Sequence, residues 1–507
     1  MRALLRTYGI SLIAGVLLAV SFPSWNFYWL AWVAPALLFW RVRRARALEA
    51  AAQFFAAGWV FHTILLQWQI SNIYWVGGFA VLGYELLCLL LALFWALTGA
   101  VWVHARRQAP RFGNALGLAL LWTFLEFLEA RLFTGFGWSA LGYSQGPNLW
   151  LLQLAAVGGV SLISFILALV NALLALAAQE GPWRYRRLAA AAAVVVLAHA
   201  GGALLLREAA YPEQPFNVGI IQPAFPQDMK WSGLYDEQMV RESARMSSQL
   251  AARAPLDLVV WPEATVMESF DREPYATALR AVARDTQAGL FAGAVRETGR
   301  KSFNSSVLLD RSGETAGYYD KVHLAPFGEY MPFSGILPFL RQIVPADVDA
   351  GEVQKVLPFE ERTLGPLICF EVLFSPMAET LRRMGADTLV VVTNLGWFGR
   401  SCAAAQELDI ARLRAIETRL PVIHAANTGL SGVFDPYGRF ARMYEQYTAL
   451  QTLAHRCMQV IPLPLPAARP VPWGPRTAPW AFAILAGLWV SAALAWGRRA
   501  PDRPWKD

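Results

Sequence analysis

The chain has 507 residues, of which 56% are hydrophobic and only 16% are charged. This composition excludes an ordinary soluble protein and indicates a membrane protein with room for two or three domains. The formal net charge of +7 comes largely from arginines grouped between apolar segments, so no nucleic-acid partner is needed to explain it.

Long apolar segments fill the chain before about Leu206. A helix needs about 20 apolar residues to cross a bilayer, and on that basis we expect about eight membrane-spanning helices. They are placed at 8–22, 27–40, 51–68, 76–104, 115–132, 149–178, 188–206 and 478–496. A cleavable signal peptide is the alternative for the first segment, but no clean cleavage pattern follows it and six more apolar segments come after it before Leu206.

Arginines occur in alternate loops of this arrangement and are nearly missing from the others. The clusters are Arg2 and Arg6; Arg41, Arg43, Arg44 and Arg46; Arg106, Arg107 and Arg111; Arg184, Arg186 and Arg187; and Arg498, Arg499 and Arg503. Because basic residues stay on the cytoplasmic side, we expect both termini there. Seven spans then place the following polar segment outside the cytoplasm. The expected domains are 1–207, a membrane domain; 208–470, an extracytoplasmic domain; and 471–507, a last helix with a cytoplasmic tail.

Within 208–470, short apolar runs alternate with amphipathic stretches. Strands are expected at 216–222, 256–261, 289–295, 306–309, 365–370, 388–393 and 421–425, and helices at 236–252, 274–286 and 403–418. This alternation predicts an α/β domain with a mostly buried sheet.

Three residues at or just after these runs predict a catalytic site. They are Glu263 in Trp-Pro-Glu-Ala-Thr, Lys321 in Tyr-Asp-Lys-Val-His and Cys369 in Leu-Ile-Cys-Phe-Glu. A carboxylate, an ammonium and a thiol at one edge of a sheet supply a base, an electrostatic clamp and a nucleophile for acyl transfer through a thioester. Burial that raises the pKa of the glutamate, and an ammonium that lowers the pKa of the thiol, would bring the two closer.

The cysteines leave other interpretations open. Cys369 could be a buried core residue or belong to a disulfide. Cys402 and Cys457 could pair with each other, whereas Cys369 is expected to be free.

Several motifs together resemble the carbon–nitrogen hydrolase (nitrilase) superfamily, and within it the membrane-bound apolipoprotein N-acyltransferase branch. The motifs are Trp-Pro-Glu-Ala-Thr, Asp-Lys-Val-His-Leu-Ala-Pro-Phe-Gly-Glu-Tyr, Ile-Cys-Phe-Glu and Asn-Leu-Gly-Trp-Phe. The resemblance implies an αββα sandwich. It also implies transfer of a fatty acyl chain from a phospholipid to the N-terminal amine of a diacylglyceryl-cysteine lipoprotein. The enzyme would be a monomer in the bacterial inner membrane, with its catalytic domain in the periplasm.

The resemblance also implies a set of supporting residues. Glu329 and Glu371 would orient Lys321 and Cys369 or assist proton transfer, and a structural hydrogen-bond role is the alternative. The remaining candidates are Trp231, which matches a family aromatic associated with lipid access; Asn304, a polar site residue; and Phe370, whose backbone N–H would donate to an oxyanion.

No metal or cofactor is expected. His323 and His424 lack His, Cys or carboxylate companions at ligand spacing, and no nicotinamide, flavin or nucleotide motif occurs in the sequence. The apolar stretch 332–344 is expected to dip into the membrane interface, with ordinary domain packing as the alternative.

Three other functions compete with acyl transfer. A membrane-tethered amidase or nitrilase-type hydrolase would share the same three residues. A transporter would use carboxylates near the apolar segments, such as Glu85, Glu126 and Glu129. A non-enzymatic lipoprotein-binding module would not need Cys369.

Overall fold

The computed structural model describes residues 2–499, apart from 24, 74–76, 109–113, 180, 331–347, 443–454 and 468–473. The chain divides into two compact units. The helical unit comprises Met1–Gln69, Val81–Leu206 and Val471–Asp507, and the α/β unit comprises Ile70–Ala80 and Arg207–Pro470.

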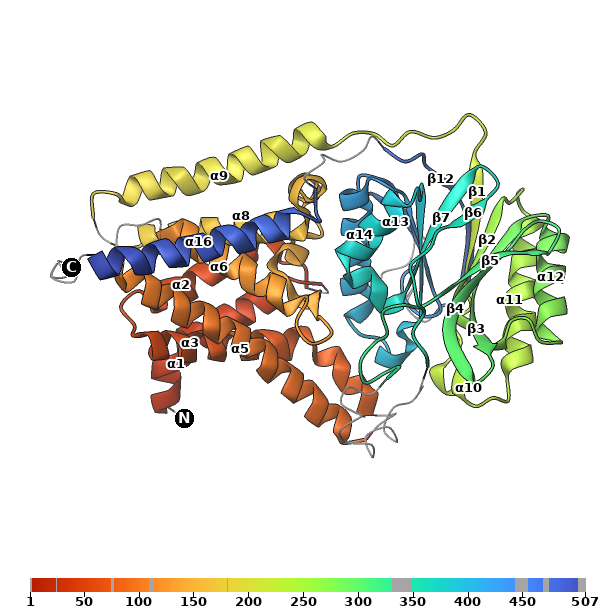
Figure 1. Ribbon diagram of the computed structural model, residues 1–507, viewed down its shortest axis with the longest axis horizontal. Coiled ribbons are helices and arrows are strands. Elements are labelled where there is room, and N and C mark those ends of the chain that lie inside the picture. Colours follow the sequence, from red (N-terminus) through yellow and green to blue (C-terminus); the bar gives the residue numbers. More distant parts are fainter. Residues whose placement is uncertain are drawn as a thin grey trace. The chain divides into compact units, whose positions relative to one another are not determined.

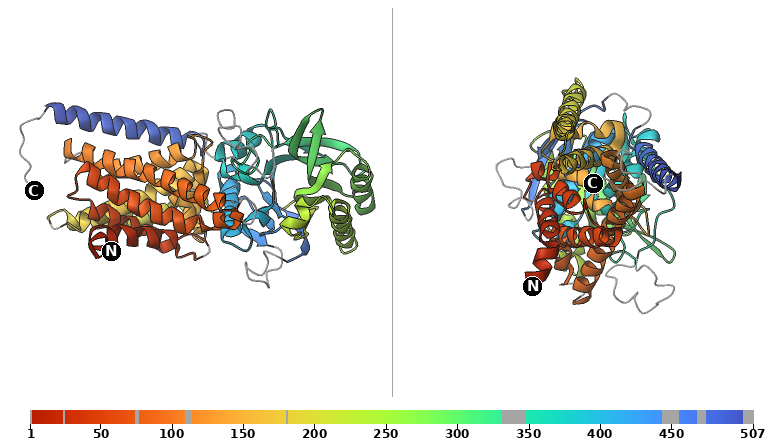
Figure 2. Two further views of the ribbon diagram at one scale, coloured as in Figure 1. Left: turned by 90° about the horizontal axis from the view of Figure 1, so that it is seen from below. Right: turned by 90° about the vertical axis from the view of Figure 1, so that its left-hand side faces the viewer.

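The helical unit is built from long helices that run alongside one another (Figure 2). They are α1 (Arg2–Ala19), α2 (Ala34–Arg41), α3 (Ala47–Leu65), α5 (Phe79–Gln108), α6 (Asn114–Glu129), α8 (Ala155–Ala177), α9 (Arg184–Leu205) and α16 (Ala478–Arg499), with the short α7 (Leu149–Leu152). The 3-10 turns of this part are η1 (Tyr28–Trp32), η2 (Gln67–Asn72), η3 (Gly137–Ser139) and η4 (Leu141–Gln145). Helix α6 packs against α8 and α16, and α1 packs against α3.

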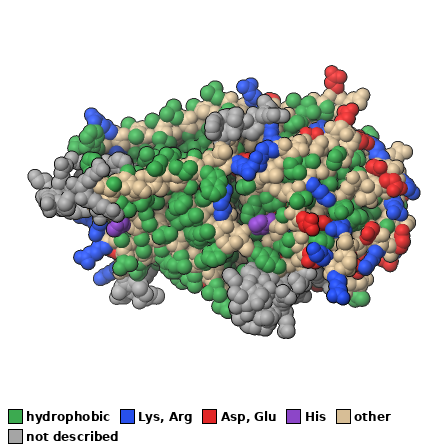
Figure 3. Space-filling view, viewed as in Figure 1, with side chains coloured by type: hydrophobic (Ala, Val, Ile, Leu, Met, Phe, Trp, Pro, Cys, Tyr) green, Lys and Arg blue, Asp and Glu red, His purple; other side chains and the backbone are tan. Residues whose placement is uncertain are grey.

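Four of the described helices are long and apolar enough to cross a bilayer: Phe79–Arg107, Ala155–Ala177, Arg184–Leu205 and Ala478–Trp496. Arg6–Ala19 is a shorter apolar helix. Hydrophobic side chains cover much of the visible surface of this unit (Figure 3). The expected count of about eight crossings therefore stays a prediction.

Two of the expected spans are interrupted. The segment 27–40 forms η1 and then α2, whose first turn contains a proline that cannot donate a helical hydrogen bond. The segment 149–178 forms α7 and then α8, and α8 is kinked by the non-helical backbone of Gly158 and Gly159.

The three carboxylates that favoured a transporter are bonded to other groups of the protein. Glu126 accepts hydrogen bonds from the Trp122 indole at 2.7 Å and from the Leu141 amide at 2.8 Å. Glu129 accepts one from the Ser139 hydroxyl, and Glu85 accepts one from the Trp59 indole. These bonds join helices to neighbouring turns and helices, which is a packing role.

The α/β unit contains two six-stranded sheets packed face to face, with helices on both outer faces (Figure 1). The first sheet has the order β12-β1-β2-β3-β4-β5, and the second has the order β11-β10-β9-β8-β7-β6. The strands are β1 (Phe216–Gln222), β2 (Leu258–Ser269), β3 (Gly289–Thr298), β4 (Lys301–Leu309), β5 (Thr315–Asp320), β6 (Leu357–Phe359), β7 (Arg362–Ile368), β8 (Thr388–Thr393), β9 (Val422–Ala426), β10 (Gly432–Phe434), β11 (Phe440–Arg442) and β12 (Cys457–Leu463).

Helices α11 (Asp236–Ala251) and α12 (Tyr275–Thr286) cover the first sheet, and α13 (Ser375–Arg383) and α14 (Ala403–Thr418) cover the second. The short α10 (Gln227–Trp231) precedes α11, and the 3-10 turns η6 (Cys369–Leu373) and η7 (Leu395–Phe398) follow β7 and β8. The layers are helix, sheet, sheet and helix, which is the expected αββα arrangement.

Strand alternation explains the two cores of this unit. In β2, Leu258 and Val260 point into the core between the sheets, and Val259 and Trp261 point toward the helices of the first sheet. The Trp261 indole donates to the Ser247 hydroxyl of α11 at 2.9 Å, so this large buried side chain leaves no unpaired donor. The fully apolar core fixes the register of β2 and thereby the position of the residues that follow Trp261.

Candidate active site

The structure brings Glu263, Lys321 and Cys369 together in the α/β unit. Glu263 lies on β2, Lys321 directly follows β5, and Cys369 begins η6 directly after β7. Strand β7 ends at Ile368, slightly earlier than expected from sequence. Cys369 has a φ of 51°, a left-handed backbone that is costly for a residue with a Cβ.

Lys321 is a buried ammonium held between two carboxylates. Its Nζ lies 2.8 Å from Glu329 Oε2 and 3.7 Å from Glu263 Oε1. Burial alone would lower the pKa of Lys321, but the charges of Glu329 and Glu263 raise it above its usual range. Lys321 is therefore a permanent positive charge at the site.

Asn304 connects the same two carboxylates. Its Nδ2 lies 2.8 Å from Glu263 Oε1 and 2.8 Å from Glu329 Oε1. A neutral donor at this point reduces the repulsion between the carboxylates and fixes the direction of Glu263. The structure thus places Asn304 and Glu329 in contact with the expected catalytic residues.

Cys369 is half-buried and is not in a disulfide, and neither are Cys88, Cys402 and Cys457. Burial and the charge of Glu263 raise the pKa of the Cys369 thiol well above its ordinary value. Lys321 and the nearby Thr393 hydroxyl lower the pKa of the thiol, but they do not outweigh burial and the charge of Glu263. Lys321 thus lowers the pKa of the thiol as expected, but by too little to offset burial. The thiol is therefore neutral at rest and needs a base.

Glu371 is fully buried and accepts four hydrogen bonds. The donors are the Tyr319 hydroxyl at 2.7 Å and the backbone N–H groups of Val322, His323 and Ile368 at 2.9, 3.1 and 2.8 Å. Burial raises the pKa of Glu371, partly offset by these bonds. Since its partners flank Lys321 and Cys369 in sequence, Glu371 ties together the two segments that carry them, in line with the structural alternative.

An aromatic group lies beside the nucleophile. The ring centroid of His323 lies 3.9 Å from the ring centroid of Phe374 and 5.8 Å from that of Phe370. Trp231 ends α10, but its side chain lies outside the described part of the structure, as does the apolar stretch 332–344. Their proposed contacts with lipid stay predictions.

Two site residues were missed in the sequence. The buried Lys230 donates from Nζ to the backbone carbonyl of Glu263 at 3.0 Å, and burial lowers its pKa to about 8. The buried Glu407 of α14 lies where its charge would act on Cys369, and its Oε1 is 3.9 Å from His424 Nε2. The sequence offered a signal only for Lys230, which directly precedes the site candidate Trp231. Glu407 gave no signal, because it is far in sequence from the residues that surround it in the structure.

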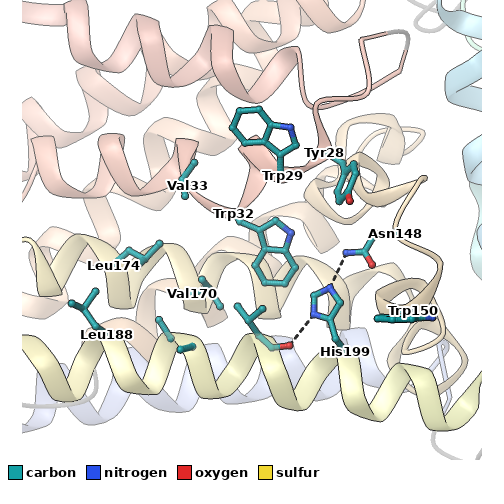
Figure 4. A pocket seen from close by; sticks show the side chains of 13 residues that line it. Tyr28, Trp29, Trp32, Val33, Asn148, Trp150, Val170, Leu174, Leu188 and His199 are labelled. Atoms are coloured by element: carbon teal, nitrogen blue, oxygen red, sulfur yellow. Dashed lines mark hydrogen bonds between the residues drawn. The ribbon is translucent and has the colours of Figure 1, made fainter.

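A separate apolar groove of about 590 Å³ lies in the helical unit, lined by residues of η1, α7, α8 and α9 (Figure 4). At its polar end Asn148 Nδ2 lies 3.1 Å from His199 Nε2, and His199 Nδ1 lies 2.8 Å from the Val195 carbonyl oxygen. Because these groups bond one another, the walls left for a ligand suit hydrocarbon.

The layered α/β unit, with glutamate, lysine and cysteine at one site, defines a carbon–nitrogen hydrolase domain. The carbon–nitrogen hydrolase family model matches residues 218–456, and the model of the apolipoprotein N-acyltransferase N-terminal domain matches residues 14–173. Among solved structures, the carbon–nitrogen hydrolase of Helicobacter pylori G27 aligns at a TM-score of 0.37 and 19% identity over 45% of this chain and 85% of that chain.

Relatives extend the similarity across both units. The apolipoprotein N-acyltransferase of Geobacter metallireducens is 34% identical over 86% of this chain and 87% of its own length. The apolipoprotein N-acyltransferase of Agrobacterium fabrum is 32% identical over 85% of this chain and 86% of its own length. The chain belongs to the apolipoprotein N-acyltransferase family.

Proposed function

We propose that this chain transfers a fatty acyl chain from a phospholipid to the N-terminal amine of a diacylglyceryl-cysteine lipoprotein, through a thioester on Cys369. The observation that supports this most is the similarity to named N-acyltransferases over both units, including the helical one. A membrane-tethered amidase would need only the α/β unit, and is less favoured for that reason.

In the first half-reaction, the Glu263 carboxylate takes the thiol proton and Sγ attacks the ester carbonyl of the phospholipid. The oxyanion that forms is stabilised by the Lys321 ammonium and by the backbone N–H of Phe370. Collapse breaks the ester C–O bond, and Glu263 returns its proton to the departing lysophospholipid. The permanent charge of Lys321 supports this role, because its electrostatic stabilisation does not depend on pH near neutrality.

In the second half-reaction, the α-amine of the lipoprotein attacks the thioester. Glu263 removes a proton from this amine, and the thiolate leaves and regains a proton as Cys369. A thioester suits the task because it keeps enough acyl-transfer potential to acylate an amine. The whole cycle needs no metal or other cofactor.

We also propose the setting of this reaction: the inner membrane, with both termini in the cytoplasm and a monomeric enzyme whose α/β domain lies in the periplasm. The described contacts support one part of this. Arg106 and Arg107 donate to the carbonyls of Val42 and Ala45, and Arg41 donates to Thr7. Three arginine-bearing segments thus gather at one end of the helical unit, as a single cytoplasmic face would require.

The test separates transfer from hydrolysis. Purified protein given phospholipid without acceptor should gain a hydroxylamine-sensitive adduct of one acyl chain on Cys369, and Cys369→Ala should gain none. A peptide with a diacylglyceryl-cysteine N-terminus should then take up the acyl chain. If water releases the acyl chain equally fast without the peptide, the chain is a hydrolase. If Cys369→Ala still acylates the peptide, the thioester mechanism is wrong.

A further inference from the structure

Three buried polar groups lie on the α14 side of Cys369. They are Glu407 from α14, His424 from β9 and Thr393 from the end of β8, with 2%, 0% and 0% of their surfaces exposed. Both carboxyl oxygens of Glu407 and the Nε2 of His424 have no hydrogen-bond partner within bonding geometry, and the Thr393 hydroxyl only partly stabilises the ionised form of Glu407. A buried carboxyl group without a donor is costly if it is ionised.

The tautomer of His424 indicates what Glu407 needs. His424 Nδ1 lies 2.8 Å from the carbonyl oxygen of Leu430. A carbonyl only accepts, so Nδ1 carries a hydrogen and Nε2 of the neutral ring presents a lone pair. This lone pair faces Glu407 Oε1 at 3.9 Å. Two acceptors face each other, and one proton on Glu407 would remove the repulsion between them.

Burial favours the neutral form of both groups. It lowers the pKa of His424 to about 4 and raises the pKa of Glu407 to about 8. A charged imidazolium–carboxylate pair would desolvate two ions, and at 3.9 Å it would lack the hydrogen bond that offsets this cost. At neutral pH the pair is therefore a carboxylic acid beside a neutral histidine.

We propose that Glu407 is a positioning residue for Cys369 that works in its protonated form and, on ionising, opposes formation of the thiolate. The charged and titratable groups that act on Glu407 from the surrounding elements are His424, Cys369, Glu263 and Lys321. Lys321 already faces Glu263 and Glu329. A third carboxylate would leave less of its positive charge to stabilise a thiolate or an oxyanion.

This inference rests on the proposed role of Cys369 as nucleophile, and it predicts a pH dependence. When pH rises through about 8, Glu407 loses its proton, and the new negative charge raises the pKa of the Cys369 thiol further. The rate of Cys369 acylation by phospholipid should therefore fall on the alkaline side. If Glu407 only packed α14 against β9, its ionisation would cause no such fall in the acylation rate at alkaline pH.

Glu407→Gln is the decisive variant, because its amide resembles the carboxylic acid in size and can present a donor toward His424 Nε2, but it cannot ionise. The rate of Cys369 alkylation by iodoacetamide, followed by peptide mass between pH 6 and pH 10, reports thiolate formation without any substrate. We expect the apparent pKa of Cys369 to fall by about one unit in Glu407→Gln. The alkaline fall in acylation should also be lost.

Glu314→Gln is the matched control, since it removes one carboxylate from an exposed position and should leave both profiles unchanged. Each variant is first checked by thermal melting. If Glu407→Gln does not fold, Glu407→Met, which is also uncharged and similar in size, decides the matter.

Identical alkylation profiles in wild type and the uncharged variant would overturn the inference. An upward shift of the Cys369 pKa would overturn it equally. Failure of the proposed function would show differently, as a wild-type Cys369 that gains no acyl chain from phospholipid while the alkylation difference persists.

Discussion

Lys321 dominates the electrostatics of the site, because it is a buried ammonium with two carboxylates and a thiol around it. Glu329 takes the closest contact at 2.8 Å, and Glu263 lies farther off at 3.7 Å. The longer distance leaves Glu263 less tightly paired, which suits a carboxylate that must accept a proton. Glu329 is then the closer counter-charge to the Lys321 ammonium at rest, and it holds the ammonium in position.

Lys321→Arg should lower the rate of Cys369 acylation by roughly 10²-fold, the effect of losing one oxyanion donor. The substitution keeps the charge, but a planar guanidinium cannot replace a compact ammonium in a fully buried position. Single-turnover acylation by phospholipid, read by mass, measures the loss. Arg284→Lys, at an exposed ion pair with Glu314, is a matched control and should keep the wild-type rate. A rate for Lys321→Arg within twofold of wild type would show that charge alone is enough.

The residues whose positions the sequence predicted best lie in or directly after strands. Glu263, Lys321 and Cys369 each come at or just after an apolar run, so the sheet itself brings them together. Glu407 could not be found in this way, because it sits on a helix whose buried face is defined only by tertiary packing. The pKa of Cys369 could not be predicted either, since it depends on how far burial outweighs one ammonium.

Strand β2 is irregular where it carries Glu263. Its register against β3 shifts between Trp261 and Val266, and Ala264 has a left-handed φ of 50°. This bulge turns the strand so that Glu263 faces the site instead of continuing the alternation of the core residues. Gly293 on the neighbouring strand makes room for it.

Gly293→Ala should displace Glu263. A Cβ at this position would lie 2.4 Å from the Pro262 carbonyl oxygen and 2.6 Å from the Glu263 Cα, and these backbone atoms cannot rotate away. We expect acylation of Cys369 to fall by roughly 10²-fold, since a shift of about 1 Å at a catalytic group has this effect. Gly83→Ala in α5, where a Cβ meets open space, serves as the control. Normal acylation by a folded Gly293→Ala protein would contradict the need for this close approach.

The strands that the sequence did not predict are mostly short or lie at the edge of a sheet. β6, β10 and β11 have three residues each, too few for a periodic pattern. β12 contains a proline and pairs antiparallel with β1 from the far end of the α/β unit, which no local pattern reveals. β1, β8 and α14, in contrast, begin and end at the expected residues, because their apolar runs are continuous or bounded by clear breaks.

At the scale of the whole molecule, the helical unit shows a consistent pairing of arginine with tryptophan. Arg43, Arg106 and Arg186 lie over the rings of Trp40, Trp102 and Trp183 at 3.9, 4.6 and 4.6 Å from the ring centroids. Tryptophan favours the membrane–water interface, and arginine favours the cytoplasmic one. These pairs come from three of the arginine clusters that the sequence placed in the cytoplasm. The number of crossings stays a prediction, because Pro35 and the Gly158–Gly159 pair interrupt apolar segments that read as continuous in the sequence.

The proposed topology predicts opposite accessibility for two exposed positions. Tyr185, 78% exposed at the start of α9, adjoins an arginine cluster and should face the cytoplasm, whereas Gln249 on the exposed side of α11 should face the periplasm. With outer-membrane-permeabilised cells, a membrane-impermeant maleimide should label Gln249→Cys at once and Tyr185→Cys only after the inner membrane is opened. Wild-type protein, with its native cysteines, gives the background for both. If both variants were labelled before the inner membrane is opened, the proposal that the membrane separates the α/β domain from the arginine clusters would be wrong. The reaction would then have to draw its phospholipid from the leaflet on the arginine side, because the site and the clusters would share one face.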